Sequence, residues 1–360
     1  MSTENKTRIG IIGAGNIGNV HAGEFSKLGD DCVITAVTDL DLARAEKLAK
    51  QYGIENVIAT NDELIARSDI DAIIIGVPNQ FHAPLAVQAL AAGKHVLLEK
   101  PMGINSEAAR QILHAAEASD RVVMVAHQMR WESIAMQIKE QIERGELGKI
   151  YSAKTGWFRR KGIPGWGTWF TQTEQSGGGP LIDIGVHMLD LALYLMGNPK
   201  PVSVYGSTYA EFGPNRKGIG TWGTPDWDGT YDVEDLATAL IKMEDGSTLS
   251  LEVSWAVHID TDNSPFIHVM GSEGGASYRG SEGKLLTEKF DRPIESVLSK
   301  PDNDEGERAR LSRHFLACIR EGKQPITSVL SGFTNNLVLD AIYESSRTGN
   351  EVKLDWNLKQ

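Results

Sequence analysis

The chain has 360 residues, of which 41% are hydrophobic, and a formal net charge of −12 at pH 7. Single hydrophobic cores usually stop growing near roughly 250 to 300 residues, so this length predicts two domains. The acidic charge argues against nucleic acid or an anionic membrane surface as the partner, because both attract clustered Lys and Arg.

The amino-terminal residues 1–8 are polar and resemble no signal peptide, and no apolar run approaches the ~18 residues of a membrane span. The two cysteines, Cys32 and Cys318, are far apart and show neither disulfide nor metal spacing, which fits a reducing compartment. We therefore expect a cytoplasmic protein with no membrane partner and no metal site.

Short apolar runs alternate with helical segments up to residue 126, which predicts a parallel sheet covered by helices on both faces. The runs cover 8–12, 33–38, 72–77, 95–98 and 122–125, and the helices include 41–52 and 82–92. Residues 1–126 are thus predicted to form a doubly wound, Rossmann-like domain.

A glycine motif, Gly13-Ala-Gly-Asn-Ile-Gly18, follows the first run and begins a helix. Gly13 permits a tight turn, Gly15 lets the backbone approach a pyrophosphate, and Gly18 lets the helix pack on the strand. Asp39 ends the second run, 21 residues past Gly18, where a carboxylate binds a ribose and repels the 2′-phosphate of NADP. The motif predicts NAD rather than NADP; the alternative is a glycine turn that binds no nucleotide.

Glu99-Lys100-Pro101 closes the predicted strand 95–98, and ligands of parallel sheets bind beyond the carboxyl ends of the strands. The Lys100 ammonium could orient a substrate hydroxyl and stabilise negative charge on its oxygen. The alternative is a surface lysine at the start of a loop.

Beyond residue 150, longer alternating stretches predict a half-exposed, antiparallel sheet. These stretches cover 150–158, 202–209, 237–243, 248–257 and 266–270, with a hairpin turn at 244–247. Helices are predicted at 180–196, 309–321 and 332–347, and the last is expected to return to cover one of the domains, with the first domain as the candidate. Residues 127–360 are predicted to form an α+β domain with a large open, mostly antiparallel sheet.

Asp183 and His187 lie four residues apart on the predicted helix 180–196, so they share one face. A carboxylate there can orient the imidazole and make His187 a general base near neutral pH. Asp190, three residues beyond His187, is an alternative orienting carboxylate. Two further interpretations are a metal site, for which no third ligand is recognisable, and a core histidine beside a solvated aspartate.

The chain resembles the Gfo/Idh/MocA family of oxidoreductases, named for glucose-fructose oxidoreductase and inositol dehydrogenase. The likeness covers nearly the whole chain. It rests on the glycine motif with Asp39, on Val77-Pro-Asn79 with His82, on Glu99-Lys-Pro101, and on Gly178-Gly-Pro-Leu-Ile-Asp-Ile-Gly-Val-His187.

The resemblance implies a catalytic group of Lys100, Asp183 and His187, and hydride transfer between a ring C–H and NAD. It implies that the second domain binds substrate and that its open sheet joins subunits into a homodimer or homotetramer. The expected cofactor-binding residues are Gly13, Gly15, Asn16, Ile17, Gly18, Asp39, Pro78, Asn79, His82, Glu99 and Lys100.

The stretch 157–169 concentrates Trp with Arg and Gly, and aromatic faces pack on the C–H faces of sugar rings. Arg159, Trp166 and Trp169 are therefore expected to contact substrate together with Asp183 and His187; interface or core tryptophans are the alternative. This stretch also resembles family members that oxidise gluco-configured substrates, including glycoside 3-dehydrogenases.

The predicted function is thus an NAD-dependent dehydrogenase that acts on a ring hydroxyl of a sugar, glycoside or cyclitol. Within the enzymes, a myo-inositol 2-dehydrogenase is the alternative. Outside them, the alternative is a non-catalytic NAD-binding sensor, which would have no need of Lys100 and His187 for proton chemistry.

Overall fold

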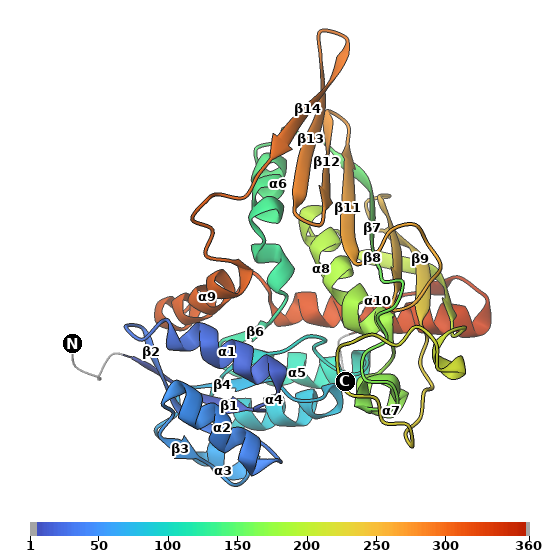
Figure 1. The fold of residues 1–360 in the computed structure, drawn as a ribbon. Helices are drawn as coiled ribbons and strands as arrows, with labels where there is room; N and C mark the ends of the chain where they lie inside the picture. Colours follow the sequence, from blue (N-terminus) through green and yellow to red (C-terminus); the bar gives the residue numbers. More distant parts are fainter. Residues whose placement is uncertain (1–5, 358–360) are drawn as a thin grey trace. The chain divides into compact units, whose positions relative to one another are not determined.

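The computed structural model describes residues 6–357, which form two compact units (Figure 1). Unit 1 contains the residues up to Ala126 together with Glu307–Phe333. Unit 2 contains His127–Gly306 together with the residues from Thr334 onward. Unit 1 thus combines the residues up to 126, where the parallel-sheet pattern of the sequence ends, with the later segment 307–333.

A backbone contact accounts for the membership of this late segment in unit 1. The N–H of Val125 donates to the carbonyl of Thr327 at 3.0 Å, and Met124 bridges to Ser328 in antiparallel fashion. Phe315 also packs edge-on against Phe25, with ring centroids 6.4 Å apart. The first residues of the last helix, through Phe333, belong with unit 1, and the rest belong with unit 2.

Unit 1 is built on a six-stranded parallel sheet in the order β3-β2-β1-β4-β5-β6. Its strands are β1 (Thr7–Ile12), β2 (Cys32–Thr38), β3 (Asn56–Val57), β4 (Ala72–Ile75), β5 (His95–Leu98) and β6 (Val123–Val125). Its helices are α1 (Asn16–Ser26), α2 (Leu42–Tyr52), α3 (Asn61–Ala66), α4 (His82–Ala91), α5 (Ser106–Glu117) and α9 (Glu307–Glu321), with the start of α10 (Val329–Thr348). The strand order reverses between β1 and β4, and ligands of such sheets bind at that switch point.

Unit 2 is built on a nine-stranded sheet in the order β14-β13-β12-β11-β7-β10-β9-β8-β15. All of its strand pairs are antiparallel except β7 with β10. The strands are β7 (Ile150–Phe158), β8 (Pro201–Tyr209), β9 (Leu236–Met243), β10 (Thr248–Ser254), β11 (Ser264–Gly271), β12 (Gly274–Arg279), β13 (Glu282–Lys289), β14 (Arg292–Leu298) and β15 (Val352–Lys353). The helices are α6 (Ser133–Glu143), α7 (Thr173–Ser176), α8 (Val186–Leu195) and the rest of α10.

One face of the unit 2 sheet is buried, as the alternating pattern predicted. In β9 the buried Ala237, Ala239 and Ile241 alternate with Leu240 and Lys242, which are exposed. Helices α6 and α8 pack on the buried face (Figure 1). The predicted fold class, a Rossmann-like parallel sheet followed by a mostly antiparallel α+β domain, is confirmed.

The stretch Thr173–Leu195, which spans α7, the glycine turn after it and α8, is long and apolar enough to cross a membrane by length and composition. However, 89% of its most apolar window is buried inside the protein. We therefore assign this stretch to the core of unit 2.

Candidate functional site

The glycine loop of unit 1 joins β1 to α1 at the switch point of the sheet. Gly13 has a φ of +101°, and an added Cβ there would overlap the backbone of Gly76. A Cβ on Gly18 would overlap the carbonyl of Gly13. These two positions need glycine for the turn and for close packing of the helix, as predicted.

Gly15 is different, because a Cβ built on it meets nothing within 4 Å. It is the N-cap of α1, and no side chain caps that helix end. The first helical residues, Asn16 and Ile17, follow it directly, with Asn16 exposed. Open space at a helix N-terminus fits the phosphates of a dinucleotide, since the N–H groups and the positive end of the dipole point there.

Asp39 lies beside this loop. Its carboxylate accepts from the N–H of Ala14 at 2.7 Å and from the N–H of Asp41 at 2.8 Å. The end of β2 thus holds a carboxylate against the glycine turn, in the position where a ribose hydroxyl binds in Rossmann folds. The residues present fit NAD.

The loop after β4 carries Pro78 and Asn79, and His82 begins α4 directly after it; all three are predicted cofactor-binding residues. Asn79 and His82 are buried, and Pro78 is half-buried. The two ring nitrogens of His82 lie 2.7 Å from the carbonyl of Pro101 and 2.9 Å from that of Val77. His82 therefore joins this loop to the Lys100 segment, and its role toward NAD stays a prediction.

Glu99 is buried and its carboxylate is engaged within unit 1. His21 of α1 lies 2.8 Å from one oxygen, and the N–H of Lys100 donates to the other at 3.2 Å. Burial alone raises the pKa of Glu99, but the His21 hydrogen bond and the charges of His21, Arg308 and Lys100 lower it to about 2. Glu99 thus links helix α1 to the Lys100 segment. No motif in the sequence predicted this link.

This depressed pKa predicts a pH-dependent contribution to stability. The Glu99 carboxylate should stabilise the fold by about 3 kcal/mol above pH 4.5, its unfolded value, and lose that contribution as pH falls toward 2. Denaturant unfolding of the wild type and Glu99→Gln from pH 7 down to 3 measures it, and the difference between them should shrink with acid. Glu117→Gln, at an exposed position on α5, is the control, and a difference independent of pH would contradict the prediction.

Lys100 lies two residues beyond the end of β5 and is half-buried. The Lys100–Pro101 peptide is cis. Lys100 therefore leaves the sheet at its carboxyl edge, the edge to which β1 brings the glycine loop. This is the placement that the sequence predicted for it within unit 1.

In unit 2, Asp183 and His187 stand on one continuous helical segment. It begins as a π-helical turn (Leu181–Gly185) and continues as α8. The indole N–H of Trp255, a fully buried residue, donates to the Asp183 carboxylate at 3.0 Å. Single π turns are frequent at functional sites, and no feature of the sequence distinguished this one from an ordinary helix.

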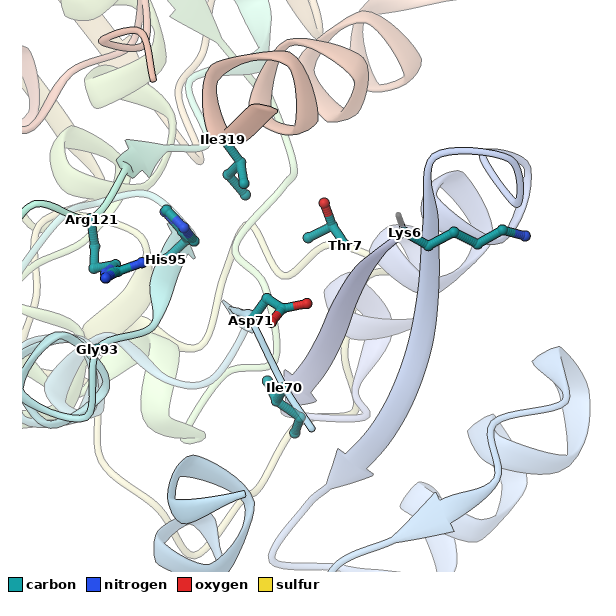
Figure 2. A pocket seen from close by; sticks show the side chains of 8 residues that line it. All are labelled: Lys6, Thr7, Ile70, Asp71, Gly93, His95, Arg121 and Ile319. Carbon is teal, nitrogen blue, oxygen red and sulfur yellow. The ribbon is translucent and has the colours of Figure 1, made fainter. Parts of the chain in front are cut away.

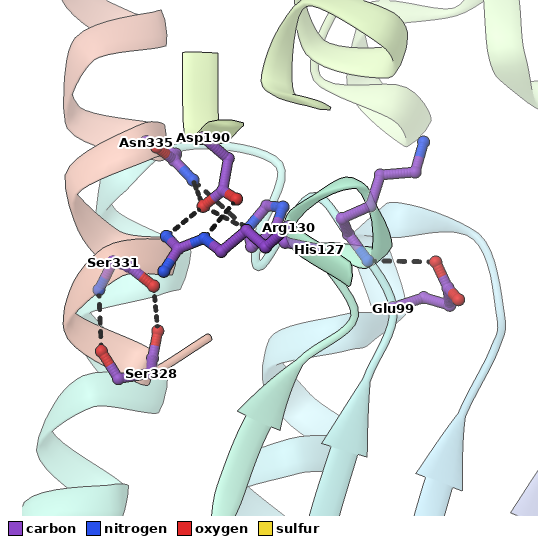
Figure 3. Close-up of polar contacts among 8 residues, drawn as sticks. Glu99, His127, Arg130, Asp190, Ser328, Ser331 and Asn335 are labelled. Atoms are coloured by element: carbon purple, nitrogen blue, oxygen red, sulfur yellow. Dashed lines mark hydrogen bonds and ion pairs between the residues drawn. The ribbon is translucent and has the colours of Figure 1, made fainter. Parts of the chain in front are cut away.

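The alternative carboxylate, Asp190, has other partners. It accepts two hydrogen bonds from Arg130, at 2.6 and 2.7 Å, and one from Asn335 at 3.0 Å (Figure 3). His127 lies 3.7 Å from the same carboxylate. Burial raises the pKa of Asp190, but the charges of Arg130 and His127 outweigh burial and lower it. Asp190 is thus engaged by Arg130 and Asn335, and the orienting role of Asp183 toward His187 stays a prediction.

Trp157, near the end of β7, lies beside His187 of this helix segment. Its centroid is 6.4 Å from the His187 ring, and the Arg159 guanidinium lies 4.9 Å from the same indole. The indole N–H donates to Asn263 at 3.0 Å. Arg159 and His187 thus flank one tryptophan, which fits the predicted substrate role of Arg159.

The other two predicted substrate residues lie in aromatic stacks of unit 2. Trp166 is buried against Trp227 and Tyr231, with Arg216 4.7 Å from its ring. Trp169 is half-buried, and its ring centroid is 3.8 Å from that of Phe170. Their contact with substrate stays a prediction, and the packing of Trp166 is that of a core residue.

A cavity in unit 1 lies at the amino ends of the strands, opposite to the glycine loop (Figure 2). It is lined by Lys6, Thr7, Ile70, Asp71, Gly93, His95, Arg121 and Ile319. None of the predicted site residues lines it. Within residues 6–357, no group of three or more His, Cys, Asp or Glu side chains could hold a metal ion.

The fold and the glycine loop together define a nicotinamide-dependent oxidoreductase. Residues 7–127 match the oxidoreductase family with an NAD-binding Rossmann fold, and residues 135–277 match the GFO/IDH/MocA C-terminal domain. The chain belongs to this Gfo/Idh/MocA family. The predictions of the family, of an oxidoreductase and of NAD as cofactor are confirmed, and the enzyme class disfavours the non-catalytic sensor.

Several relatives match over almost their full length. The chain is 32% identical to D-glucoside 3-dehydrogenase of Escherichia coli K12 over 360 residues, which cover 98% of this chain and 99% of that protein. It is 27% identical to scyllo-inositol 2-dehydrogenase (NAD(+)) of Bacillus subtilis 168, covering 98% and 97%. A solved structure of levoglucosan dehydrogenase in complex with NADH shares the fold, with a TM-score of 0.88, 24% identity, and coverage of 97% and 99%.

Proposed function

We propose that this protein is an NAD-dependent dehydrogenase that oxidises a secondary hydroxyl on the ring of a sugar or glycoside. The observation that carries the proposal is the helix on which Asp183, held by Trp255, stands four residues before His187. An imidazole beside a fixed carboxylate is suited to accept a hydroxyl proton near neutral pH. The full-length similarity to a D-glucoside 3-dehydrogenase supports a gluco-configured substrate oxidised at C3.

In this proposal His187 accepts the hydroxyl proton and Asp183 keeps the imidazole oriented. The Lys100 ammonium positions the same hydroxyl and stabilises the negative charge that develops on its oxygen. Bound NAD supplies the redox chemistry, as the acceptor of the hydride from the ring carbon.

The binding roles are proposed along the same lines. The glycine loop and the start of α1 bind the pyrophosphate, and Asp39 binds the ribose. Pro78, Asn79, His82 and Glu99 shape the cofactor site. Arg159, Trp166 and Trp169 contact the sugar.

A panel of substrates tests the proposal. We expect NADH absorbance to rise when the protein is incubated with NAD⁺ and a methyl glucoside, and to stay flat with the matched 3-deoxy glucoside. Folded protein that binds NAD but reduces it with no glucoside, free sugar or inositol would rule the proposal out.

An inositol is the second candidate substrate, because the chain is 27% identical to a scyllo-inositol 2-dehydrogenase. myo-Inositol and scyllo-inositol therefore belong in the panel. Faster turnover of either inositol than of every glucoside would favour this second function.

We also propose that the protein is cytoplasmic and assembles into a homodimer or homotetramer through the open face of the unit 2 sheet. Both cysteines, Cys32 and Cys318, are free and buried, which suits a reducing compartment. Tyr205 and Leu240 pair across β8 and β9, and each is more than half exposed, as expected for a sheet face that a second subunit covers.

A further inference from the structure

Glu234 lies just before β9 in the sequence. Its buried carboxylate contacts the beginning of the helical segment that carries Asp183 and His187. Its two oxygens accept from the N–H of Gly179 and from the N–H of Leu181, each at 2.9 Å. The hydroxyl of Tyr343, on α10, donates to the second oxygen at 3.0 Å. Only 6% of Glu234 is exposed, so this carboxylate is satisfied by protein donors.

The two N–H groups that Glu234 binds lie on either side of Pro180, which has no N–H. The first N–H groups of a helix have no partner within the helix, and an acceptor that binds them fixes where the helix begins. One carboxylate therefore holds both N–H groups that flank the proline. Asp183 follows only two residues after Leu181.

The glycines before Pro180 fit closely against the same two residues. A Cβ on Gly179 would overlap the backbone carbonyl of Glu234, and one on Gly178 would overlap the Tyr343 hydroxyl. The Gly178-Gly179-Pro180 turn is thus held by hydrogen bonds to Glu234, and its glycines leave no room for a Cβ against Glu234 and Tyr343.

A carboxylate in this place is unfavourable in itself. Burial raises the pKa of Glu234, and hydrogen bonds from Leu181, Gly179 and Tyr343 oppose that rise. An exposed Ser or Asn would cap a helix start without the penalty of a buried charge. A carboxylate that accepts hydrogen bonds from two backbone N–H groups is useful where the position of the helix must be precise.

We propose that Glu234, with Tyr343, is a positioning residue for the reaction, which sets the start of the helix so that Asp183 meets Trp255 and His187 faces the substrate. This inference rests on the proposed function of His187. The Glu234 side chain acts through the helix, because the partners of its carboxylate are the turn and Tyr343. A displacement of about 1 Å in a reacting group can lower turnover about 100-fold.

Glu234→Gln tests the proposal, since it keeps the shape of the side chain but replaces one acceptor oxygen with an NH₂ group. This group faces a backbone N–H and cannot accept a hydrogen bond from it. We expect kcat to fall about 10- to 100-fold with the KM for NAD unchanged. The indole N–H signal of Trp255, followed by NMR in the protein without substrate or cofactor and assigned with Trp255→Phe, should move because its bond to Asp183 changes. Glu234→Asp, which keeps an acceptor carboxylate, should restore part of kcat.

Asp232→Asn is the matched control. The Asp232 carboxylate accepts from the backbone N–H of Thr173 at 2.7 Å, at the start of the separate helix α7. This variant should leave kcat and the Trp255 signal unchanged. If Glu234→Gln lowers only the melting temperature and leaves both readouts as in the wild type, Glu234 is a structural cap and the proposal is wrong.

Tyr343→Phe keeps the test open if Glu234→Gln does not fold. It removes one of the three donors, and we expect a shifted Trp255 signal and a threefold to tenfold lower kcat; a wild-type signal and rate would overturn the proposal. The NMR readout needs no turnover. Failure of the substrate panel would therefore count against the proposed function, and an unmoved Trp255 signal against the role of Glu234.

Discussion

Lys100→Met and His187→Ala are each expected to lower the rate of sugar oxidation by about 1,000-fold or more, with NAD still bound. The double variant should be nearly as active as the slower single variant, because groups that act together on one bond give non-additive losses. Initial rates of NADH formation, with NAD binding measured by titration calorimetry, check all three. Both groups are proposed to act on the same hydroxyl. Once either is removed, the other can no longer assist the reaction.

Lys50→Met is the matched control, since Lys50 is an exposed lysine at the end of α2 in the same unit as Lys100. It should retain wild-type rates. Losses that multiply in the double variant, to about a millionfold, would mean that Lys100 and His187 act in separate steps, and the proposed pairing would be wrong. Full activity of His187→Ala would exclude it as the general base.

The sequence predicted the nucleotide loop because local chemistry alone determines it. Gly13 has a φ of +101°, Gly18 packs against the carbonyl of Gly13, and both lie within one strand–turn–helix unit. The strand pattern of the unit 1 sheet was equally accessible, since strands buried on both faces, such as β4, are continuous apolar runs.

The strands β13 and β14 were missed for the opposite reason. Nearly every residue of β14 is exposed, and β13 has only Gly283 buried, so neither strand alternates apolar with polar residues. Hydrophobic periodicity reports burial on one face, and a strand pair without a buried face leaves no such signal. The hydrogen bonds between β13 and β14 are made by the backbone and are not encoded by residue type.

Partners distant in the sequence account for what was not foreseen in the candidate site. Glu99 was expected to contact the cofactor, but its carboxylate is engaged by His21, which lies 78 residues away. Trp255 reaches Asp183 across 72 residues, and Asn335 reaches Asp190 across 145. A motif in one chain gives the residue types for a site, whereas the pairing of side chains depends on the tertiary fold.

Asp190→Ala is expected to destabilise unit 2 by about 3 to 5 kcal/mol, because it leaves the buried Arg130 guanidinium without its carboxylate. Arg130 is 3% exposed and Asp190 1% exposed, so water cannot replace the lost partner. Asn335 loses the same acceptor, and His127 loses the carboxylate that lies 3.7 Å from its ring. Calorimetric melting should show a transition roughly 10 °C lower, the shift that such a loss produces in a domain of this size.

Replacing both Arg130 and Asp190 distinguishes the loss of the ion pair from the burial of an unpaired charge. Arg130→Met with Asp190→Ala should recover part of the melting temperature, because no unpaired charge is then buried. Glu140→Ala removes the carboxylate of an exposed ion pair with Arg144 on α6, and it should change stability by less than about 1 kcal/mol. If the single variant melts like the Glu140 variant, the buried cluster does not stabilise unit 2, and α8 is held in place by its apolar contacts alone.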